Sequence, residues 1–254
     1  MLSLKITVAD IDLVLQYYYQ YGEIILYRRC FIHNSKVTNK GIQEAIGQSD
    51  WQPSVDNGLF QAEKSVVTCL ELLRTHESYT TVISCCSLSL PQLIAGKDGF
   101  LSAEENRYFE QLTAKKRQHS YLLGRLTAKQ AIVKRVPEIQ ANQINIAWGV
   151  FTQPVIEHPQ IHNLQVSISH TRDYAVALAF SEYHPMGIDI EDVQRNSSQA
   201  IKSHVSLEEI NILKSLQCYN EQQILTLIWS IKEALSKLLR TGLMTNFALY
   251  AIVS

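Results

Sequence analysis

The chain has 254 residues, a formal net charge of -1 and a hydrophobic content of 46%, values that are ordinary for a globular protein. Its length is enough to bury a sizeable core and predicts one or two domains. The pI of about 6.7 and the lack of a nucleic-acid motif exclude a typical nucleic-acid-binding domain. The five cysteines are odd in number and form no Cys-x-x-Cys pair, which favours reduced thiols over a disulfide framework or a zinc site.

A membrane partner is also not expected. The longest apolar stretches, residues 175–180 and 224–231, are too short to span a bilayer. Asp10 and Asp12 interrupt any apolar core that a cleavable signal would need. We therefore expect a cytoplasmic protein.

The N-terminal region, residues 1–78, resists assignment. Residues 13–27 carry five tyrosines among apolar residues, a composition that favours a core cluster over a ligand site. Residues 63–75 are helical in character. The region could extend the segment that follows it, pack as a small domain or dock a partner, so its role is left open.

The remainder of the chain alternates between strand and helix patterns. A β-branched, apolar run at 79–87 predicts a strand. Helices are then predicted over 102–112 and 121–136, and strands over 144–151, 164–169 and 174–180. After a strand that starts at Gly187, the pattern predicts helices over 206–216 and 221–240 and a strand over 247–253.

A short acidic motif, Gly-Ile-Asp-Ile-Glu, occupies residues 187–191. On a strand, whose side chains alternate with a period of two, Asp189 and Glu191 share one face while Ile188 and Ile190 share the other. Both carboxylates could therefore reach one ion. A strand with acids on its solvated face is the alternative for this motif taken alone.

A second motif, Trp-Ser-Ile-Lys-Glu-Ala-Leu-Ser-Lys, lies at residues 229–237 in a predicted helix. Glu233 and Lys237 are spaced i, i+4 and stack on one face, which adds a third carboxylate and a cation. A solvated Glu-Lys pair is the alternative here. Oxygen ligands without His or Cys favour a hard ion such as Mg²⁺, which fills its remaining positions with water and phosphate oxygens. The two motifs together predict a magnesium-dependent enzyme that acts on a phosphate ester.

In wording and spacing these motifs resemble the two signature motifs of the 4'-phosphopantetheinyl transferase superfamily, specifically its larger, single-chain, surfactin-synthetase-activating class. The resemblance spans roughly residues 80 to 245. It implies that Asp189, Glu191 and Glu233 hold Mg²⁺. It also implies that Glu233 accepts a serine proton, directly or through a water, and that Lys237 stabilises charge on the leaving phosphate.

Other segments resemble the parts of this family that bind coenzyme A. Residues 167–171, Ser-Ile-Ser-His-Thr, resemble a Ser-His-Ser/Thr segment whose histidine contacts a phosphate. Residues 116–131 resemble a basic segment that holds the adenosine diphosphate part. Thr152-Gln153-Pro154 departs from the family's Gly-Lys-Pro pattern, which puts one loop contact in doubt. The coenzyme A contacts implied by the resemblance are Lys116, Arg117, Arg125, Lys129, Ser169, His170 and Thr171.

Charge patterning points to an anion site in the same place without use of the resemblance. Residues 111–137 contain no acid but seven lysines and arginines. Such a one-signed stretch in a balanced chain is a candidate anion site. Arg117, Arg125 and Lys129 would line one stripe of a continuous helix, where Arg offers bidentate geometry to phosphate. The alternative is a solvated helix face.

The sequence also indicates an internal duplication. Residues 129–134 and 232–237 share the pattern Lys-x-Ala-aliphatic-x-Lys at an offset of 103. Capping boxes at 102–105 and 206–209 precede them at an offset of 104. Chance alignment of two Lys-rich helices is the alternative.

Two related copies would form a pseudo-twofold pair, and a cleft often lies between such halves. Gln130 stands where the second copy has Glu233, and Cys86 or its neighbours stand where the second copy has its acidic strand. The first copy therefore lacks metal ligands. We expect one active site per chain and a monomer that contains an internal pseudo-dimer.

The predicted fold is α+β, a pseudo-twofold pair of related α/β halves with an unassigned N-terminal region. The predicted divisions are 1–78, of unknown role; 79–183, the first half, which holds the nucleotide; and 184–254, the second half, which binds the metal. They belong to the 4'-phosphopantetheinyl transferase fold that the resemblance implies.

The resemblance implies transfer of the 4'-phosphopantetheine arm of coenzyme A to a serine of an apo acyl or peptidyl carrier protein, with release of adenosine 3',5'-bisphosphate. The nucleophile would belong to the partner, which agrees with the lack of a Gly-x-Ser-x-Gly motif in this chain. A noncatalytic module that docks coenzyme A or a carrier protein is the alternative, and it would not need all three carboxylates. A phosphohydrolase is a further alternative, distinguished by its products.

Overall fold

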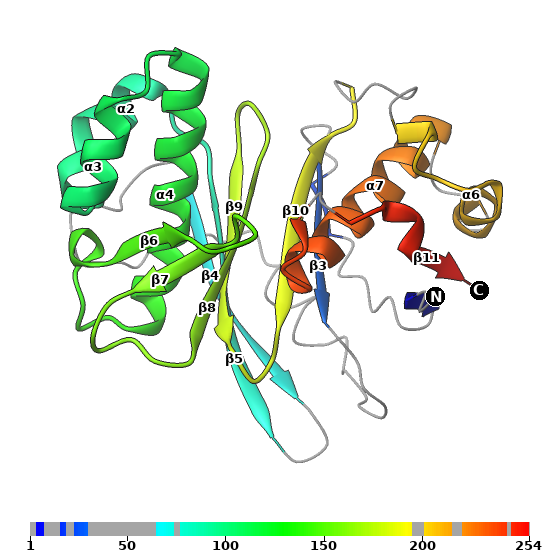
Figure 1. Ribbon diagram of the computed structural model, residues 1–254, viewed down its shortest axis with the longest axis horizontal. Helices are drawn as coiled ribbons and strands as arrows, with labels where there is room; N and C mark the ends of the chain where they lie inside the picture. Colours follow the sequence, from blue (N-terminus) through cyan, green and yellow to red (C-terminus); the bar gives the residue numbers. More distant parts are fainter. Residues whose placement is uncertain are drawn as a thin grey trace. The chain divides into compact units, whose positions relative to one another are not determined.

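The structure is a computed structural model that describes residues 4–7, 16–18, 23–29, 65–73, 77–194, 201–214, 220–242 and 245–253. It is a mixed α+β protein whose contacts divide it into two compact units (Figure 1). Unit 1 comprises Met1–Cys30, Val150–Gln153 and Met186–Ser254, and unit 2 comprises Phe31–Gly149 and Pro154–Pro185. Among the helices that are described, none is long and apolar enough to cross a membrane.

Unit 2 is built on a four-stranded antiparallel sheet. Its strands, in spatial order, are β4 (Ser65–Leu73), β5 (Ser78–Cys86), β9 (Ala175–Ser181) and β8 (Leu164–His170). The predictions of strands at 79–87, 164–169 and 174–180 are confirmed. All residues from Ala175 to Phe180 are buried, so both faces of this inner strand are excluded from water.

The predicted helical character of residues 63–75 is wrong, because Ser65–Leu73 forms strand β4. This strand pairs with β5 from Ser65 opposite Cys86 to Leu73 opposite Ser78. The β-branched residues Val66, Val67 and Thr68 suit a pleated strand. Pairing with the adjacent β5 overrides the weaker helical preference of the leucines and glutamate that follow.

A long helix, α4 (Lys115–Arg135), packs on β5, β9 and β8 of this sheet (Figure 1). It begins at Lys115, earlier than the predicted 121, and so confirms one continuous helix under Arg117, Arg125 and Lys129. Two shorter helices pack against it, α2 (Leu90–Gly96), which was not predicted, and α3 (Ala103–Glu110).

The remaining elements of unit 2 are small. The predicted strand 144–151 is shorter, β6 (Asn145–Trp148), and forms a hairpin with the unpredicted β7 (Pro154–Glu157). Two single 3-10 turns connect larger elements, η1 (Lys97–Gly99) and η2 (Ala141–Gln143).

Unit 1 contains a three-stranded antiparallel sheet in the order β10 (Met186–Asp192), β3 (Glu23–Arg29) and β2 (Gln16–Tyr18). A separate parallel pair joins β1 (Leu4–Thr7) to β11 (Tyr250–Val253), which follows the 3-10 turn η4 (Phe247–Leu249).

Two helices complete unit 1. Helix α7 (Glu221–Leu238) packs on β10 and β3, and α6 (Leu207–Lys214) packs on α7 and β11. The predicted helices at 206–216 and 221–240 are thus confirmed with slightly shorter bounds. The core of the unit is the apolar face of α7 together with the C-terminal turn and strand: Ile224, Leu227, Ile228, Ile231, Leu235, Phe247, Tyr250 and Ile252.

The segment before residue 79 contributes to both units. Its strand β3 pairs with β10 in unit 1, and its strand β4 pairs with β5 in unit 2. The division at residues 78 and 183 therefore remains a prediction about roles. The side chains of the five tyrosines in residues 13–27 lie outside the described residues.

Each unit contains a capping box whose glutamate also reaches a lysine on the long helix of its unit. In unit 2, Glu105 caps Ser102 and pairs with Lys129 at 2.5 Å. In unit 1, Glu209 caps Ser206 and pairs with Lys232 at 2.8 Å. All four side chains of the two Glu-Lys pairs are almost fully buried.

The second oxygen of each glutamate is used alike in the two units. The backbone N–H of Ile146, on β6, donates to Glu105 Oε1 at 3.2 Å. The backbone N–H of Ile252, on β11, donates to Glu209 Oε1 at 3.0 Å. One carboxylate in each unit thereby joins a helix start, a long helix and a strand.

Candidate active site

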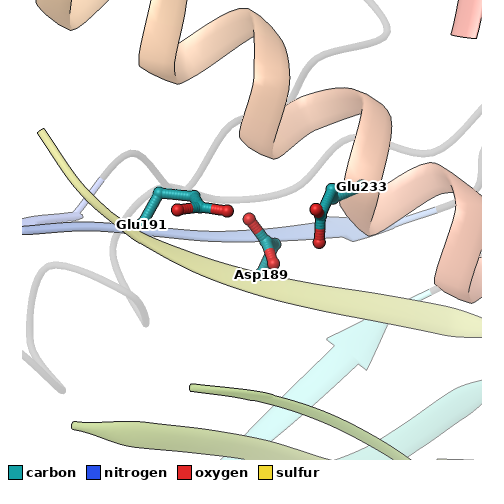
Figure 2. Close-up of side chains that lie close together, drawn as sticks. All are labelled: Asp189, Glu191 and Glu233. Atoms are coloured by element: carbon teal, nitrogen blue, oxygen red, sulfur yellow. The ribbon is translucent and has the colours of Figure 1, made fainter. Parts of the chain in front are cut away.

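The acidic motif lies on β10, at the point where α7 packs on this strand. Its alternation is as predicted: Asp189 and Glu191 point to one side (Figure 2), and Ile188 and Ile190 are buried core residues. Asp189, however, has an exposed fraction of 0%, so it does not lie on a solvent-exposed face of the strand. A buried carboxylate needs hydrogen bonds or opposite charge around it.

Gly187 allows the strand and the helix to approach this closely. A Cβ atom at this position would lie 2.0 Å from the carbonyl oxygen of Ala234 and 2.9 Å from the backbone nitrogen of Leu238. No residue with a side chain fits there unless α7 moves. The glycine of the motif therefore positions Asp189, two residues later, beside the helix.

Helix α7 supplies the third carboxylate. Its first turn is fixed by a capping box between Asn220 and Gln223, and its apolar face is buried in the core of unit 1. Glu233 then points toward the two acids of β10 (Figure 2). One ligand oxygen from each of Asp189, Glu191 and Glu233 lies within 4.8 Å of the others. The structure thus brings together the three predicted metal ligands.

Side chains of α7 also hold the carboxylates of β10. The Ser230 hydroxyl donates to Asp189 Oδ2 at 2.7 Å, and the Lys237 ammonium lies 2.6 Å from Oδ1. The Trp229 indole donates to Glu191 Oε1 at 3.1 Å. Sequence reasoning assigned no role to Ser230 or Trp229, although both precede Glu233 by about one helical turn and so share its face.

Charge and burial perturb the titration of this cluster. Burial, and next the charge of Asp189, raises the pKa of Glu233 to about 7, although Lys237 opposes the shift. Burial alone would lower the pKa of Lys237, but the carboxylates of Asp189, Glu233 and Glu191 outweigh it and raise that pKa. Lys237 therefore stays charged, whereas Glu233 can exchange a proton near neutral pH.

The donor set fits a hard divalent cation. Three carboxylates and one ammonium leave two negative charges when all are ionised, which such an ion would balance. All ligand atoms are oxygens, the class that Mg²⁺ and Mn²⁺ prefer over sulfur or imidazole. Glu233 is part-exposed at 17%, so the cluster has an open side.

The neighbouring Lys232 has a different role from Lys237. It is 1% exposed, pairs with Glu209 and donates to the carbonyl oxygen of His204 at 2.9 Å. This lysine holds α7 to the start of α6 and is turned away from the acidic cluster. Within one motif, therefore, Lys232 pairs with Glu209 and stabilises the fold of unit 1, whereas Lys237 pairs with Asp189 in the acidic cluster.

The residues predicted to hold coenzyme A lie in unit 2. Lys116 and Arg117 are exposed in the first turn of α4, next to the equally exposed Lys115. No acidic residue lies in that turn. A helix N-terminus carries a partial positive charge, so three cations beside it are repelled by that charge and by one another. A bound anion would offset this repulsion. This end of α4 is therefore suited to a phosphate group.

Arg125 and Lys129 are placed differently from that exposed pair, because both are buried and pair with Glu105. The Arg125 guanidinium also donates to the carbonyl oxygen of Ile146 at 3.1 Å, and it lies 4.9 Å from the ring centroids of both Tyr121 and Trp148.

Lys129 additionally donates to the carbonyl oxygens of Ala141 and Ile144, and burial lowers its pKa despite the Glu105 charge. The assignment of Arg125 and Lys129 to the nucleotide stays a prediction. Their burial and existing partners count against it.

The Ser-His-Thr segment lies at the end of β8. His170 is the last residue of this strand and is exposed, while Ser169 before it is buried. The Thr171 hydroxyl accepts from the backbone N–H of Tyr174 at 3.2 Å and shapes the turn into β9. Of the three residues, His170 is the exposed one, and Thr171 is half-buried.

Sequence comparison places the C-terminal part of the chain among known proteins. Residues 185–253, which carry all three carboxylates, match the family model of the 4'-phosphopantetheinyl transferase superfamily. The holo-[acyl-carrier-protein] synthase of Mycoplasma capricolum subsp. capricolum is 36% identical over 83 residues, 32% of this chain and 74% of that relative. The synthase of Geobacillus sp. (strain WCH70) is 35% identical over 91 residues, 34% of this chain and 76% of the relative.

Solved structures include a holo-(acyl-carrier-protein) synthase from Bacillus anthracis str. Ames in complex with CoA (3',5'-ADP). It is 23% identical, covers 39% of this chain and 93% of its own, and superposes with a TM-score of 0.34. The holo-ACP synthase of Plasmodium yoelii is 22% identical with a TM-score of 0.33, covering 39% of this chain and 91% of its own.

A strand and a helix here gather three carboxylates and one ammonium, a donor set of the kind that suits a hard divalent ion. The relatives are more than 30% identical to this chain over most of their own length. The chain belongs to the 4'-phosphopantetheinyl transferase superfamily.

Proposed function

We propose that this protein transfers the 4'-phosphopantetheine arm of coenzyme A to a serine hydroxyl of an apo acyl or peptidyl carrier protein. The serine oxygen forms a bond to the pantetheine-bearing phosphorus and loses its proton. The bond between that phosphorus and the bridging oxygen breaks, and adenosine 3',5'-bisphosphate leaves. The observation that carries the proposal is the acidic trio Asp189, Glu191 and Glu233 beside Lys237, in a chain that belongs to this superfamily.

In this proposal Asp189, Glu191 and Glu233 hold the divalent ion. The ion, when bound, supplies positive charge that neutralises the pyrophosphate. Glu233 is suited to accept the serine proton, directly or through a water, because its carboxylate is part-exposed at the open side of the cluster. Lys237 remains charged beside Asp189 and would stabilise the charge that develops on the leaving phosphate.

Coenzyme A would be held by the predicted contacts of the first half. Lys116 and Arg117, exposed at the start of α4, are the best placed of these for a phosphate. His170, with Ser169 and Thr171 beside it, would contact a further phosphate. Arg125 and Lys129 would act indirectly, by fixing α4 to α3 and β6 through Glu105.

We further propose that the chain is of the larger, single-chain class and arose by duplication. The relatives match only about a third of the chain. Support for a second, related copy comes from the buried pairs Glu105 with Lys129 and Glu209 with Lys232, each made by a capping-box glutamate.

The copies differ at the candidate site. Gln130, the counterpart of Glu233, accepts from the hydroxyls of Ser65 and Ser84. Burial raises the pKa of the Cys86 thiol to about 11, although its contacts with Ser65 and Thr127 oppose the shift. A neutral amide and a neutral thiol do not bind Mg²⁺ well. We therefore propose one active site per chain, in a monomer whose halves form a pseudo-twofold pair: residues 79–183 holding the nucleotide and 184–254 the metal.

The test is to incubate the protein with coenzyme A, Mg²⁺ and a panel of apo carrier proteins and to record intact masses. The expected result is the mass gain of one phosphopantetheine arm on at least one carrier, abolished by a chelator. A folded Glu233→Gln variant should lose turnover by about a hundredfold or more, as is usual when a charged group leaves an enclosed site. Binding of coenzyme A without mass gain on any carrier would instead favour a noncatalytic docking module.

A further inference from the structure

Trp229 begins the motif that ends at Lys237, yet neither metal binding nor proton transfer makes use of it. Its indole nitrogen lies 3.1 Å from Glu191 Oε1 and donates a hydrogen bond to it. The donor comes from α7 and the acceptor from β10, the two elements that form the acidic trio. The bond therefore joins these elements at the end of the cluster farthest from Gly187 along the strand.

We infer that Trp229 is a positioning residue for the ion site, which holds the Glu191 carboxylate toward Asp189 and Glu233. This inference rests on the proposed function, because it assumes that the trio binds a divalent ion. Trp229 itself does not touch the ion or the reacting atoms. Its contribution is to fix the direction of one ligand before the ion arrives.

The chemistry of indole suits this role. The indole N–H donates a hydrogen bond but cannot accept one. It can therefore hold one oxygen of Glu191 without coordinating the ion itself and without adding charge to the cluster. A carboxylate in its place would do both.

The surroundings of Trp229 make the indole a rigid donor. Its ring lies 4.9 Å from the ring of Phe247 and 5.7 Å from that of His204, at interplanar angles of 55° and 57°. Phe247 is 4% exposed and belongs to the core of unit 1. The indole is thus packed against the core of unit 1, which restricts the rotation of the ring and of its N–H.

The Glu191 side chain has more conformational freedom to lose than that of Asp189. Asp189 is fully buried, shorter by one methylene, and held by both Ser230 and Lys237. Glu191 is only half-buried and has an additional rotatable bond. Fixing the Glu191 side chain for ion binding therefore costs more conformational entropy. If the hydrogen bond from Trp229 already orders this side chain in the ion-free protein, that entropy is not lost when the ion binds.

The first experiment measures Mn²⁺ binding to the full chain without coenzyme A or carrier protein, by the electron paramagnetic resonance signal of free Mn²⁺. Trp229→Phe keeps an aromatic ring against Phe247 and His204 but removes the N–H. We expect its affinity to fall by roughly tenfold or more, the usual effect of losing a hydrogen bond to a metal ligand. The control is Trp148→Phe, which changes a 57% exposed indole in unit 2 and should leave Mn²⁺ affinity unchanged.

A double-mutant cycle separates this role from a general effect on packing. In a Glu191→Ala background, the carboxylate that Trp229 orients is absent, so adding Trp229→Phe should cause no further loss of Mn²⁺ affinity. An equal loss in both backgrounds would overturn the inference, because the tryptophan would then act through the fold. Unchanged affinity in Trp229→Phe would overturn it as well.

The proposed ion site and this inference fail in different ways. If the wild-type chain binds no Mn²⁺, both fall; if it binds and Trp229→Phe binds equally well, only the role of Trp229 falls. If Trp229→Phe does not fold, the ¹⁵N-labelled indole N–H of Trp229, assigned with Trp51→Phe and Trp148→Phe, gives the answer in chains that retain it. Its resonance should move when Glu191 is replaced by Ala, and an unmoved resonance would overturn the inference.

Discussion

Glu233 is the carboxylate at which a proton and the proposed divalent ion would compete. Burial and the charge of Asp189 raise its pKa to about 7, so it is partly protonated in the ion-free protein at neutral pH. An ion binds the ionised form, so binding must release that proton. We predict that Mn²⁺ affinity rises between about pH 6 and about pH 8 and then levels off. Titrations at a series of pH values test this, and Glu233→Gln should remove the rise.

The same carboxylate should affect the stability of the ion-free protein. The folded pKa of about 7 exceeds the ordinary value of 4.5, so the folded state holds more protons between these two values. The contribution of Glu233 is therefore fully present below pH 4.5 and is lost as the pH rises through 7. With a chelator present, wild type should lose stability relative to Glu233→Gln across this window. A constant difference in their unfolding midpoints would contradict the shift.

The basic residues of α4 should separate into two classes by mutation. Arg117 is exposed at the helix start, so we predict that Arg117→Ala raises the Michaelis constant for coenzyme A with little change in maximal rate. Loss of a charge-assisted hydrogen bond corresponds to about 1 to 3 kcal/mol. Arg125 is buried against Glu105, so Arg125→Ala should chiefly lower the thermal midpoint.

Steady-state kinetics with saturating carrier protein and thermal melts of both variants provide the measurement. A stable Arg125→Ala protein with a raised Michaelis constant would restore Arg125 to the nucleotide site. An Arg117→Ala protein with an unchanged constant would show that the start of α4 is only a solvated face.

The meeting of the three carboxylates was predictable from the residues, but the hydrogen bonds that hold them were not. Period-two alternation on β10 and i, i+4 spacing on α7 are local rules, so they indicated Asp189, Glu191 and Glu233 correctly as a group that can meet. The roles of Ser230 and Trp229 depend on how far α7 is shifted along β10. The periodicity of the sequence does not predict that shift. The position of Ser230 and Trp229 on the same helix face as Glu233 was a signal that could have been used.

At the scale of elements, the contact between β10 and α7 depends on Gly187. We predict that Gly187→Ala displaces α7, weakens Mn²⁺ binding and destabilises the protein, because its Cβ would meet the helix backbone at 2.0 Å. Gly96→Ala is the matched control, since its Cβ would have nothing within 4 Å. Both variants are compared by thermal unfolding and Mn²⁺ titration. Equal behaviour would show that α7 does not need this close approach.

Helices and strands were predicted correctly where the sequence pattern was long. The prediction failed where pairing with a neighbouring strand determines the conformation. The helices at α4 and α7 have strong helix formers over many residues, and the strands β8 and β9 have clear apolar runs. Strand β4 was missed because its leucines and glutamate favour a helix in isolation. Its conformation follows from pairing with β5, which is a tertiary effect.

At the scale of the whole molecule, the aligned capping boxes indicated a repeat, but they did not indicate which charged residue each capping-box glutamate pairs with. Sequence alignment matched Lys129 with Lys232 and Glu105 with Glu209 as separate pairs. In the structure, each lysine reaches the glutamate of its own unit. The contact spans helices that are distant in sequence, so spacing rules cannot predict it. Charged residues that recur at the aligned positions of the proposed repeat were the available signal.

These two buried pairs differ in one respect that can be measured. Glu105 pairs with two buried cations, Arg125 and Lys129, whereas Glu209 pairs with one, Lys232, among the residues that the structure describes. Removing one partner of a buried ion pair typically costs about 3 to 5 kcal/mol, because the other charge is left uncompensated. We therefore predict that Glu105→Ala and Glu209→Ala both destabilise the protein strongly, and that Glu105→Ala does so more.

Chemical denaturation followed by hydrogen exchange of α4 and α7 reports on the two units separately, as is needed if they unfold in separate steps. The loss of protection should be confined at first to α4 in Glu105→Ala and to α7 in Glu209→Ala. Glu104→Ala is the control, because this neighbour is exposed and its pair with Arg107 is a surface contact. A Glu209→Ala protein less stable than Glu105→Ala would show that the number of stranded charges does not govern the stability of the two units.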